Sequence, residues 1–498
     1  MVAAADAKAA LEQLRRALEF TRTVELRLDY LKDDAEIARF LAALAKTRVR
    51  ATGKTTLIAT CRRVAAGGKY RGSAANQLIF LAEAISAGCT WYDLDIETAS
   101  VAPRGLVDVL VGEGRQLLSA HYFRESPRNL KKVAATLAAF QPDAAKIAVQ
   151  LGTIAESVKI IELARGRSNF VAVPMGEAAL PARVLALRHG SALAFAPVEQ
   201  STAPGQVSLE SLTQLYRADK LTRKTRVFGV IGDPIGHSLS PRLHNAGFQS
   251  AKIDAVFLPF LVRDVKDFVS AIKPLGIRGF AVTLPHKQTI MRHLDSVDPM
   301  AKAIGAVNTV TVSASGKLHG LNTDYVGVLR ALEKRMPFQG SRVLIVGAGG
   351  AARAVAYALA QAGSLVCITA RRPQQAESLA RAVRGQAVAR AKVRGQFFDA
   401  IVNTTPVGMH PHESASPLEP AELNTRLVFD LIYRPQLTKL LQLAQRRGIE
   451  TVSGLDMFVA QGIAQWEIWT GRRAPVAPML AAVKRALAGT EKPGRKRK

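Results

Sequence analysis

One lysine stands in an unexpected setting, the middle of the small apolar run PDAAKIAVQ at residues 142–150. The run around Lys146 is typical of a buried strand. Burial disfavours the charged form of a lysine, and the free amine of a partly dehydrated lysine can attack a ketone to form an imine. The alternative is that the long side chain of Lys146 reaches solvent past its apolar neighbours.

A histidine, His121, lies near the end of a second apolar run, QLLSAHYF at residues 116–123. An unperturbed histidine titrates near neutrality, so it could remove the C–H proton that an iminium acidifies and then protonate a departing hydroxyl. Those two steps eliminate water without a metal ion. Taken alone, His121 is better explained as a structural histidine, whereas beside Lys146 it is the preferred general base.

A second kind of chemistry is indicated by a tight glycine turn between an apolar strand and a helix, in SRVLIVGAGGAARAVAYALAQAG at residues 341–363. The turn fits the dinucleotide fingerprint, whose small residues let a pyrophosphate approach the backbone and the helix N-terminus. The residues expected at the cofactor are Gly347, Ala348, Gly349, Gly350 and Ala351. The next strand, LVCITA, is followed by Arg371 and Arg372, where an NAD enzyme would carry an acidic residue. Two arginines suit a 2′-phosphate, so NADP is favoured over NAD.

The elements that must hold Lys146 and His121 form an alternating series of strands and helices. Seven β-rich runs lie between residues 23 and 198: TVELRLD, TTLIATCR, WYDLDIE, QLLSAHYF, AAKIAVQ, NFVAVPM and ALAFAPV. This rhythm predicts a TIM-type (β/α) barrel with one strand missing, since eight close the usual barrel. Polar residues gather at the ends of these runs, and barrel active sites are built from such positions. They are Glu25, Arg27, Arg62, Asp95, His121 and Lys146.

Composition excludes several classes of protein. No apolar run approaches the roughly 20 residues that cross a bilayer, and the N-terminus lacks a signal-peptide core, so a soluble cytoplasmic protein is expected. The cysteines Cys61, Cys89 and Cys367 are scattered, which supports neither a disulfide framework nor a zinc site. The net charge of +28 would fit a nucleic-acid binder, but the basic residues are dispersed, so a solvated positive surface that attracts small anions is favoured.

Eight ordered motifs in the second half resemble shikimate dehydrogenase. They are GDPIGHSLSP, VTLPHK, IGAVNTV, GLNTDYVG, GAGGAARA, NTTPVGM, VFDLIYRPQLTKLL and GLDMFVAQGIAQWEIWTG. The resemblance implies a two-lobed α/β region with a Rossmann nucleotide domain, and it makes Lys287 and Asp324 the catalytic pair. It implies substrate contacts by Ser238, Ser240, Thr283, Asn308, Tyr433 and Gln461. It adds Thr404 and Met457 to the cofactor contacts.

The first half resembles type I 3-dehydroquinate dehydratase across most of the barrel. The motifs are ELRLDYL, CRRVAAGGKYRG, LLSAHYFRESP, PDAAKIAV, PMGEAALPARVLALRHGSALAFAP and STAPGQ. The resemblance makes Lys146 the imine-forming residue and His121 its acid-base partner. It implies substrate contacts by Glu25, Arg27, Arg62, Arg183, Thr202 and Gln206. Arg62 and Arg183 would anchor a carboxylate through two-pronged hydrogen bonds.

Three departures from these families are visible. Asp95 stands where the dehydratases carry a glutamate that orients the histidine, so its contact with His121 is expected to run through water. Ala281 replaces the asparagine that usually precedes the VT pair in the dehydrogenases, which removes one polar group near that site. The first barrel strand is missing ahead of the initial helix, and a misassigned start codon is the simple explanation.

The expected domains follow from these matches. A dehydratase-like barrel at 1–215 and a linker at 216–225 precede a substrate domain at 226–325 and an NADP-binding Rossmann domain at 326–455. Helices at 456–488 would return to the substrate domain, and 489–498 would be a disordered basic tail.

The two resemblances together imply a bifunctional enzyme of the shikimate pathway. It would dehydrate 3-dehydroquinate to 3-dehydroshikimate and reduce that ketone to shikimate with NADPH. The partners expected are these small substrates and, as a possible assembly, a homodimer; no membrane is expected, and nucleic acid is disfavoured. Two alternatives stay open, an oxidative quinate or shikimate dehydrogenase that uses NAD, and a regulatory protein that keeps these folds as ligand sensors.

Overall fold

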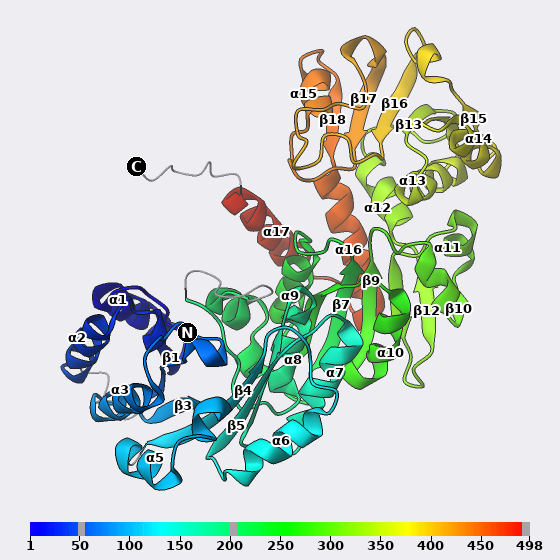
Figure 1. Cartoon of the computed structure of the whole chain (residues 1–498). Coiled ribbons are helices and arrows are strands. Elements are labelled where there is room, and N and C mark those ends of the chain that lie inside the picture. The colour runs from blue at the N-terminus through cyan, green and yellow to red at the C-terminus, as the bar shows by residue number, and fades with distance from the viewer. Residues whose placement is uncertain (48–54, 113, 199–206, 491–498) are drawn as a thin grey trace. The chain divides into compact units, whose positions relative to one another are not determined.

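The computed structural model describes residues 1–47, 55–112, 114–198 and 207–490 (Figure 1). The chain forms two compact units, one of Met1–Thr225 with Phe260–Leu275 and the other of Arg226–Pro259 with Gly276–Lys498. The fold class is α/β throughout, as predicted, because each unit is built from strands that alternate with helices.

The first unit contains a parallel sheet whose strands are paired in chain order, the order of a (β/α) barrel. The strands are β1 (Thr23–Arg27), β2 (Thr56–Thr60), β3 (Trp91–Asp95), β4 (Arg115–Tyr122), β5 (Ala144–Gln150) and β6 (Phe170–Met175). The helices are α1 (Ala7–Leu18), α2 (Asp34–Ala45), α3 (Ala74–Ser86), α4 (Ile96–Ala99), α5 (Arg104–Val111), α6 (Leu130–Ala139), α7 (Ile154–Leu163) and α8 (Leu180–Arg188). Six of the seven predicted strands are therefore confirmed.

The seventh predicted strand, residues 192–198, is wrong as a regular strand. It makes separate backbone bonds: the Ala192 amide donates to the Phe170 carbonyl, and the Val198 amide donates to the Met1 carbonyl. Val2 pairs in parallel with Leu26 of β1, and the Met1 amino group donates to the Ala196 carbonyl over 2.7 Å. Residues 1 and 2 thus lie between β1 and residues 196–198, the place where the prediction lacked a strand.

The second unit begins with a mixed sheet of order β10-β12-β11-β9-β7-β8. Its strands are β7 (Arg226–Gly232), β8 (Ala255–Leu261), β9 (Ile277–Val282), β10 (Ser296–Val297), β11 (Thr309–Val312) and β12 (Leu318–Leu321). Helices α9 (Ser240–Ser250), α10 (Val265–Leu275) and α11 (Pro299–Ile304) belong to the same stretch of chain. Strand β11 runs antiparallel to both β9 and β12, which places the start of β11 beside the end of β9.

A fully parallel sheet follows, of order β15-β14-β13-β16-β17-β18. Its strands are β13 (Arg342–Val346), β14 (Leu365–Thr369), β15 (Gln386–Ala387), β16 (Phe398–Asn403), β17 (Thr425–Asp430) and β18 (Glu450–Ser453). Its helices are α13 (Gly350–Gln361), α14 (Pro373–Ala382) and α15 (Lys439–Gln445). Alternate residues of β13 enter separate cores, Val343 and Ile345 on one face and Leu344 and Val346 on the other. The sheet is therefore covered on both faces, as in doubly wound nucleotide-binding folds.

Two long helices complete the second unit, α16 (Gly454–Thr470) and α17 (Val476–Thr490), and α16 packs against α12 (Asp324–Leu332). The close approach of α12 and α16 depends on Gly327. A Cβ atom at that position would lie 2.9 Å from the Met457 carbonyl oxygen and 3.3 Å from the Gln461 Cβ. Glycine at position 327 thus allows α12, which carries Asp324, and α16, which carries Gln461, to pack at this short distance.

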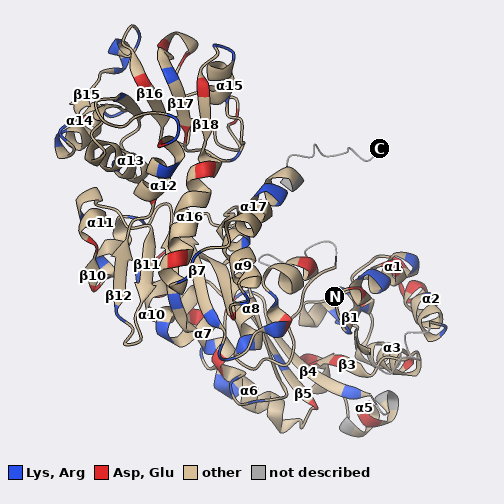
Figure 2. Cartoon of the chain, turned by 180° about the vertical axis from the view of Figure 1, so that it is seen from behind, with Lys and Arg blue, Asp and Glu red and all other residues tan. Residues whose placement is uncertain are grey.

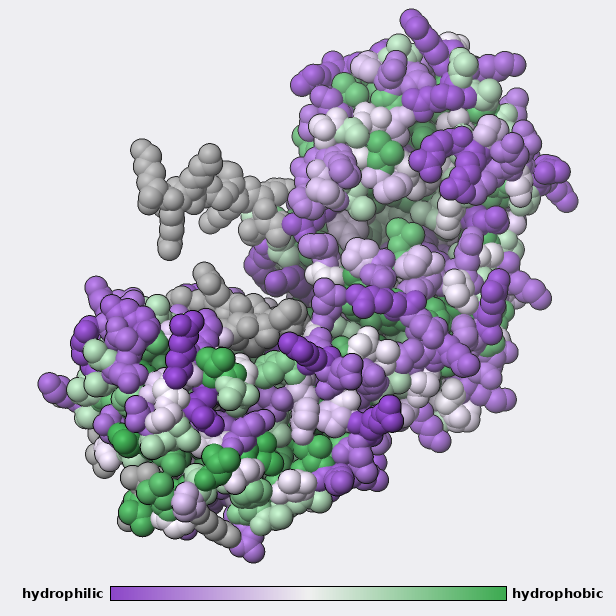
Figure 3. All heavy atoms as spheres, in the orientation of Figure 1, coloured by the Kyte–Doolittle hydropathy of each residue, from purple (hydrophilic) through white to green (hydrophobic). Residues whose placement is uncertain are grey.

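The surface agrees with the expectation drawn from composition. Lysine and arginine residues are distributed over many helices and are interspersed with acidic residues (Figure 2). Hydrophilic residues cover much of the face seen in Figure 3. Among the described residues, no helix is long and apolar enough to cross a membrane, and no group of His, Cys, Asp and Glu could hold a metal ion. All three cysteines are free and buried.

Candidate functional site

Lys146 lies inside the barrel of the first unit, on β5. A buried apolar cluster of Leu117, Ala144 and Val171 belongs to the same strands: Leu117 pairs in register with Ala144, two residues before Lys146, and Val171 pairs with Lys146 itself. The lysine itself is only 3% exposed, so the alternative that it reaches solvent is wrong. Its Nζ donates to the Asp93 carboxylate over 2.6 Å and lies 3.8 Å from a Glu25 oxygen.

Asp93 holds several of the polar side chains together and was not singled out by the sequence analysis. Besides Lys146, its carboxylate accepts hydrogen bonds from Arg62 over 2.8 Å and from Ser119 over 2.6 Å. Burial alone would raise the pKa of Asp93, but the positive charges of Lys146 and Arg62 outweigh burial and hold that pKa well below its usual value. The alternation in WYDLDIE, which puts Asp93 and Asp95 on the same face of β3, was the available signal.

Asp95 makes no direct hydrogen bond to His121 in the described structure, and its expected contact through water stays a prediction. Its carboxylate accepts from the Gln77 side chain over 2.7 Å and from the Thr98 amide over 2.8 Å. The second bond makes Asp95 the N-cap of α4. The carboxylate is therefore engaged with a helix terminus and a neighbouring amide, and the His121 Nδ1 is buried without a hydrogen-bond partner in the described structure.

His121 lies one layer above Lys146, toward the carboxyl ends of the strands. Lys146 is paired in register with Ser119, two residues before His121 on β4, so both side chains face the barrel interior. The imidazole stacks on Phe123 with ring centroids 5.7 Å apart. Burial, then the charges of Arg62 and Lys146, lower the pKa of His121 well below its usual value, so the ring is neutral at rest.

A cavity of about 130 Å³ brings the predicted residues together. Its wall includes Glu25, Arg27, Arg62, His121, Lys146 and Arg183. Four of these present a buried polar atom without a hydrogen-bond partner in the described structure: Glu25 Oε2, Arg62 Nε, His121 Nδ1 and Arg183 Nε. Unpartnered buried polar atoms are rare in proteins, and four around one cavity point to a polar ligand. Thr202 and Gln206 lie outside the described residues.

The arginines of this cavity differ in their pairing. Arg27 is bound by Asp29 over 2.8 Å, and Arg62 is bound by Asp93. Arg183 is 7% exposed and makes no ion pair with any described residue. Burial lowers the pKa of Arg183 to about 10, and the group remains charged at neutral pH. An unpaired buried guanidinium is suited to binding a carboxylate.

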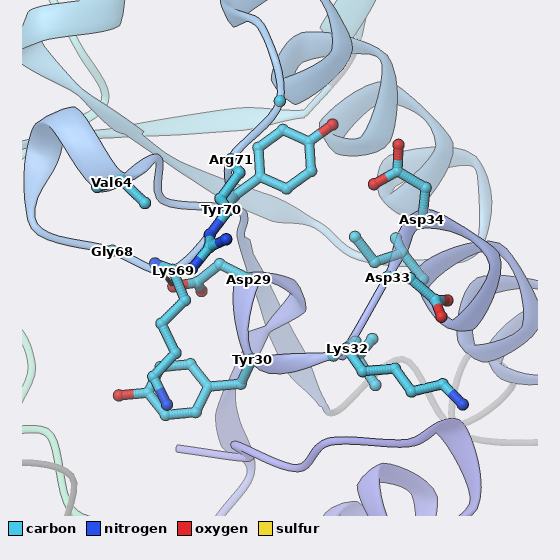
Figure 4. A pocket seen from close by; sticks show the side chains of 13 residues that line it. Asp29, Tyr30, Lys32, Asp33, Asp34, Val64, Gly68, Lys69, Tyr70 and Arg71 are labelled. Atoms are coloured by element: carbon cyan, nitrogen blue, oxygen red, sulfur yellow. Dashed lines mark hydrogen bonds between the residues drawn. The ribbon is translucent and has the colours of Figure 1, made fainter.

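A larger cavity of about 600 Å³ shares Tyr30 with the first. Figure 4 shows the Lys69 ammonium over the Tyr30 ring, at 3.9 Å from its centroid. The Arg27 guanidinium also lies over this ring, at 4.7 Å. None of the residues predicted for chemistry lines the larger cavity, so the reaction is assigned to the smaller one.

The second unit contains another lysine beside a carboxylate. The Lys287 Nζ donates to Asp324 Oδ2 over 2.5 Å, and the other oxygen of Asp324 accepts from Asn308 Nδ2 over 2.8 Å. Lys287 follows β9, Asn308 precedes β11 and Asp324 begins α12, so the antiparallel pairing of β9 with β11 positions the first two. The Lys287 side chain is 21% exposed and the Asp324 side chain 8%, so the pair faces an opening.

The remaining predicted substrate residues make no hydrogen bond to this pair in the described structure, and their role in binding stays a prediction. Thr283 follows β9, and its amide donates to the Ile231 carbonyl; Ser238 and Ser240 lie at the start of α9. On α16, Gln461 donates to the Phe458 carbonyl. Tyr433, which follows β17, packs against the Phe458 ring at a tilt, with ring centroids 4.8 Å apart. Ala281, which replaces the asparagine usual in the dehydrogenases, is buried on β9, two residues before Thr283.

The glycine turn fits a dinucleotide. Gly347 has φ of +118°, and a Cβ there would lie 2.4 Å from the Thr404 hydroxyl. Helix α13 begins at Gly350 with no side-chain cap, which leaves its first amides able to bind a pyrophosphate. Arg371 and Arg372 follow β14 and are exposed, as a 2′-phosphate site requires. Met457 is buried in the core beside Gly327.

Three families match the chain in order. Residues 1–223 match type I 3-dehydroquinase, residues 230–310 match the shikimate dehydrogenase substrate binding domain, and residues 454–484 match the shikimate 5′-dehydrogenase C-terminal domain. These matches cover both lysine sites, because Lys146 lies in the first and Lys287 in the second.

Similar proteins cover either the whole chain or its second half. Shikimate dehydrogenase (NADP(+)) of Methanothermobacter thermautotrophicus is 43% identical over 54% of this chain and 99% of its own length. The crystal structure of a shikimate dehydrogenase in complex with NADP+ is 37% identical over 53% of this chain and 96% of its own, with a TM-score of 0.50. The crystal structure of Aquifex aeolicus shikimate dehydrogenase is 36% identical over 52% of this chain and 98% of its own, also with a TM-score of 0.50.

One relative spans both units. It is the chloroplastic bifunctional 3-dehydroquinate dehydratase/shikimate dehydrogenase of Arabidopsis thaliana, 33% identical over 476 residues, which are 91% of this chain and 78% of the relative. The two lysine sites and the order of the matched domains agree with this organisation, and the chain belongs to the family of bifunctional 3-dehydroquinate dehydratase/shikimate dehydrogenases.

Proposed function

We propose that this chain converts 3-dehydroquinate to 3-dehydroshikimate in its first unit and reduces 3-dehydroshikimate to shikimate with NADPH in its second. The observation that carries the proposal is the pair of lysine-carboxylate sites, Lys146 with Asp93 and Lys287 with Asp324, one in each unit of the chain. The similarity of 91% of the chain to a bifunctional relative supports the same assignment.

In the dehydratase site, Asp93 and Glu25 hold the Lys146 Nζ at the base of the cavity. The deprotonated amine attacks the substrate ketone and water leaves, which gives an iminium that acidifies the neighbouring C–H. Neutral His121 removes that proton, and the protonated ring then donates it to the departing hydroxyl, so that water is eliminated. Hydrolysis of the imine releases the product. Arg183 binds the substrate carboxylate and fixes its orientation.

In the reductase site, Lys287 and Asp324 are the residues proposed to act at the ketone oxygen of the substrate. Lys287 donates a proton to the developing alkoxide. Asp324 orients the Lys287 ammonium and accepts a hydrogen bond from a substrate hydroxyl. The Gly347 turn, the start of α13, Arg371 and Arg372 would hold the dinucleotide, and Thr404 lies beside that turn. The resemblance to shikimate dehydrogenases also makes Met457 a cofactor contact, although its side chain is buried against Gly327. NADPH supplies the hydride when it is bound.

NADP is preferred over NAD because Arg371 and Arg372 stand where a ribose-binding carboxylate would repel a 2′-phosphate. A purely oxidative, NAD-dependent enzyme is therefore disfavoured. The ligand-sensor alternative leaves the two lysine-carboxylate pairs without a role. The cytoplasmic location stays a prediction, since the Arabidopsis relative is named chloroplastic, and so does the homodimer.

The test compares the unmodified chain with Lys146→Met and Lys287→Met. With 3-dehydroquinate alone, dehydroshikimate absorbance should rise in all but Lys146→Met. With 3-dehydroshikimate and NADPH, nucleotide oxidation should be lost only in Lys287→Met. Borohydride should trap a covalent adduct at residue 146 only when substrate or product is present. Loss of both activities in both variants would contradict the division into two sites.

A further inference from the structure

We propose that Gln465 is a positioning residue for ketone reduction, acting through Thr309 and Asn308 on the Asp324 carboxylate. This inference rests on the reductase function proposed above. Gln465 lies on α16, is 1% exposed and touches neither Lys287 nor Asp324 through any hydrogen bond of the described structure. Its effect on the reaction is therefore indirect.

The orientation of the Gln465 amide is fixed by its partners. Its Nε2 lies 3.2 Å from the Asn308 backbone oxygen and 3.1 Å from the Thr309 hydroxyl. A backbone oxygen only accepts hydrogen bonds, so the nitrogen and not the oxygen of the amide must face it. The same backbone oxygen also accepts from the Val282 amide of β9 over 2.8 Å. Gln465 thus joins α16 to the point where β9 meets β11.

The Gln465 amide also sets the direction of the Thr309 hydroxyl. A hydroxyl has one proton, and its oxygen here accepts from Gln465 Nε2. The proton is then directed to Asn308 Oδ1, which lies 2.7 Å away, closer than the 3.3 Å to the Thr323 hydroxyl. Without Gln465, the Thr309 hydroxyl would be free to turn.

The Asn308 side chain connects the Thr309 hydroxyl to the catalytic pair, Lys287 and Asp324. Its oxygen accepts from the Thr309 hydroxyl and from the Thr323 amide over 2.7 Å, which excludes a flipped amide. Its nitrogen donates to the Thr323 hydroxyl over 3.0 Å and to Asp324 Oδ1 over 2.8 Å. Asp324 Oδ2 is left to hold the Lys287 ammonium. A chain of hydrogen bonds therefore runs from Gln465 to the lysine.

The same helix offers a matched control. One turn further on, Trp469 Nε1 donates to the Val310 backbone oxygen over 3.1 Å. This bond also ties α16 to β11, and Trp469 is also buried, at 8% exposed. It does not involve the Thr309 hydroxyl or the Asn308 side chain, so Trp469→Phe removes a helix-to-strand bond without touching the chain of side chains.

The experiment measures kcat and KM for reduction of 3-dehydroshikimate in full-length Gln465→Met, Thr309→Val, their double variant and Trp469→Phe. We expect Gln465→Met and Thr309→Val each to lower kcat by about 10-fold to 100-fold, as small misplacements of catalytic groups do, with KM for NADPH unchanged. Thr309→Ser, which keeps the hydroxyl, should restore most of kcat. Trp469→Phe should keep kcat within about 2-fold, and dehydratase activity should be unchanged in every variant.

The double variant decides whether Gln465 acts through Thr309. If it does, the double variant should lose no more kcat than the larger single loss, whereas independent effects would multiply. Multiplied losses, an unchanged kcat in Gln465→Met, or an equal loss in Trp469→Phe would each overturn the inference while leaving the reductase function in place. An unmodified chain that reduces no 3-dehydroshikimate would overturn the proposed function, and this inference with it.

Discussion

At the scale of single residues, the two lysines proposed for chemistry share a carboxylate partner but differ in surroundings. Lys146 is almost fully buried and its partner Asp93 also binds Arg62 and Ser119. Lys287 is partly exposed, and its partner Asp324 is oriented by Asn308. A closed site keeps bulk water away from an imine, whereas a proton donor needs contact with a group that can return its proton. The environments match the different tasks.

The lysines and their motifs could be predicted from sequence, but several partners could not. Lys146, Lys287 and Asp324 stand in distinctive runs. Asp95 caps α4, and this role could not be predicted because a helix of four residues is too short to show a helical period in the sequence. Gln465 was overlooked because a buried glutamine in a helix is noticeable only when the strand that it contacts is known.

Asp430 provides a prediction about pH. This carboxyl ends β17, is buried, and accepts from Asn403 Nδ2 over 2.9 Å and from the Thr438 hydroxyl over 2.7 Å. Burial raises the pKa of Asp430 from 3.8 to about 6. The folded chain therefore binds one more proton than the unfolded chain between these values, so this group lowers the free energy of unfolding as pH rises from about 4 to 6.

Asp430→Asn mimics the protonated side chain and should remove that pH dependence. We expect the variant to be more stable than the unmodified chain by up to about 3 kcal/mol at pH 7 and equally stable near pH 4. Urea unfolding of the second unit at pH 4, 5, 6 and 7 measures the difference. A stability difference that stays constant across these pH values would contradict the assignment.

At the scale of elements, strand periodicity was the most successful guide. Six runs of alternating or continuous apolar residues became β1 to β6, and the glycine turn joined β13 to α13 as predicted. The run at 192–198 failed because it makes separate bonds to β6, Met1 and Leu209 and does not pair as a continuous strand. The pairing of Val2 with β1 was not predictable, since one apolar residue ahead of a helix has no period.

Gly327 tests whether the spacing of α12 and α16 matters for reduction. A methyl group in Gly327→Ala would overlap the Met457 carbonyl and displace α16 from α12, at a cost of about 1–3 kcal/mol. Reductase kcat should fall at least about 10-fold because Asp324 and Gln461 separate. Dehydratase activity should not change.

Gly105→Ala is the control for this variant. Gly105 is also helical, but a Cβ there would meet nothing within 4 Å. This change should leave both activities intact and stabilise α5 by up to about 1 kcal/mol. Reductase activity of both variants is measured in the same assay. An equal loss in Gly105→Ala and Gly327→Ala would argue against a specific role for the close approach of α12 and α16.

At the scale of the whole molecule, each unit has its own sheets and its own lysine site. The residues proposed for dehydration all lie between Met1 and Thr225, and those proposed for reduction all lie between Arg226 and the C-terminal side of α16. The organisation into two activities could be predicted from the order of the motifs. How the activities influence each other could not, because no motif reports on it.

Heat inactivation with and without NADPH tests this separation. A ligand that binds only the folded second unit stabilises that unit by about 2.7 kcal/mol at 100 times its dissociation constant. The temperature of half-inactivation of reductase activity should therefore rise with NADPH, and that of dehydratase activity should stay the same. Arg371→Ala with Arg372→Ala should reduce the shift for NADPH but not for NADH. Parallel protection of both activities would show that the units unfold as one.

Arg183 has a practical consequence for anyone who studies the dehydratase. A buried guanidinium that pairs with no carboxylate of the described residues does not distinguish strongly between the substrate and other oxyanions that fit beside it. Phosphate, sulfate and citrate buffers should then compete with substrate, and the apparent KM should grow with their concentration. Turnover measured in such buffers would describe a competition, so the affinity of this enzyme is best determined in cationic or zwitterionic buffers with chloride as the anion.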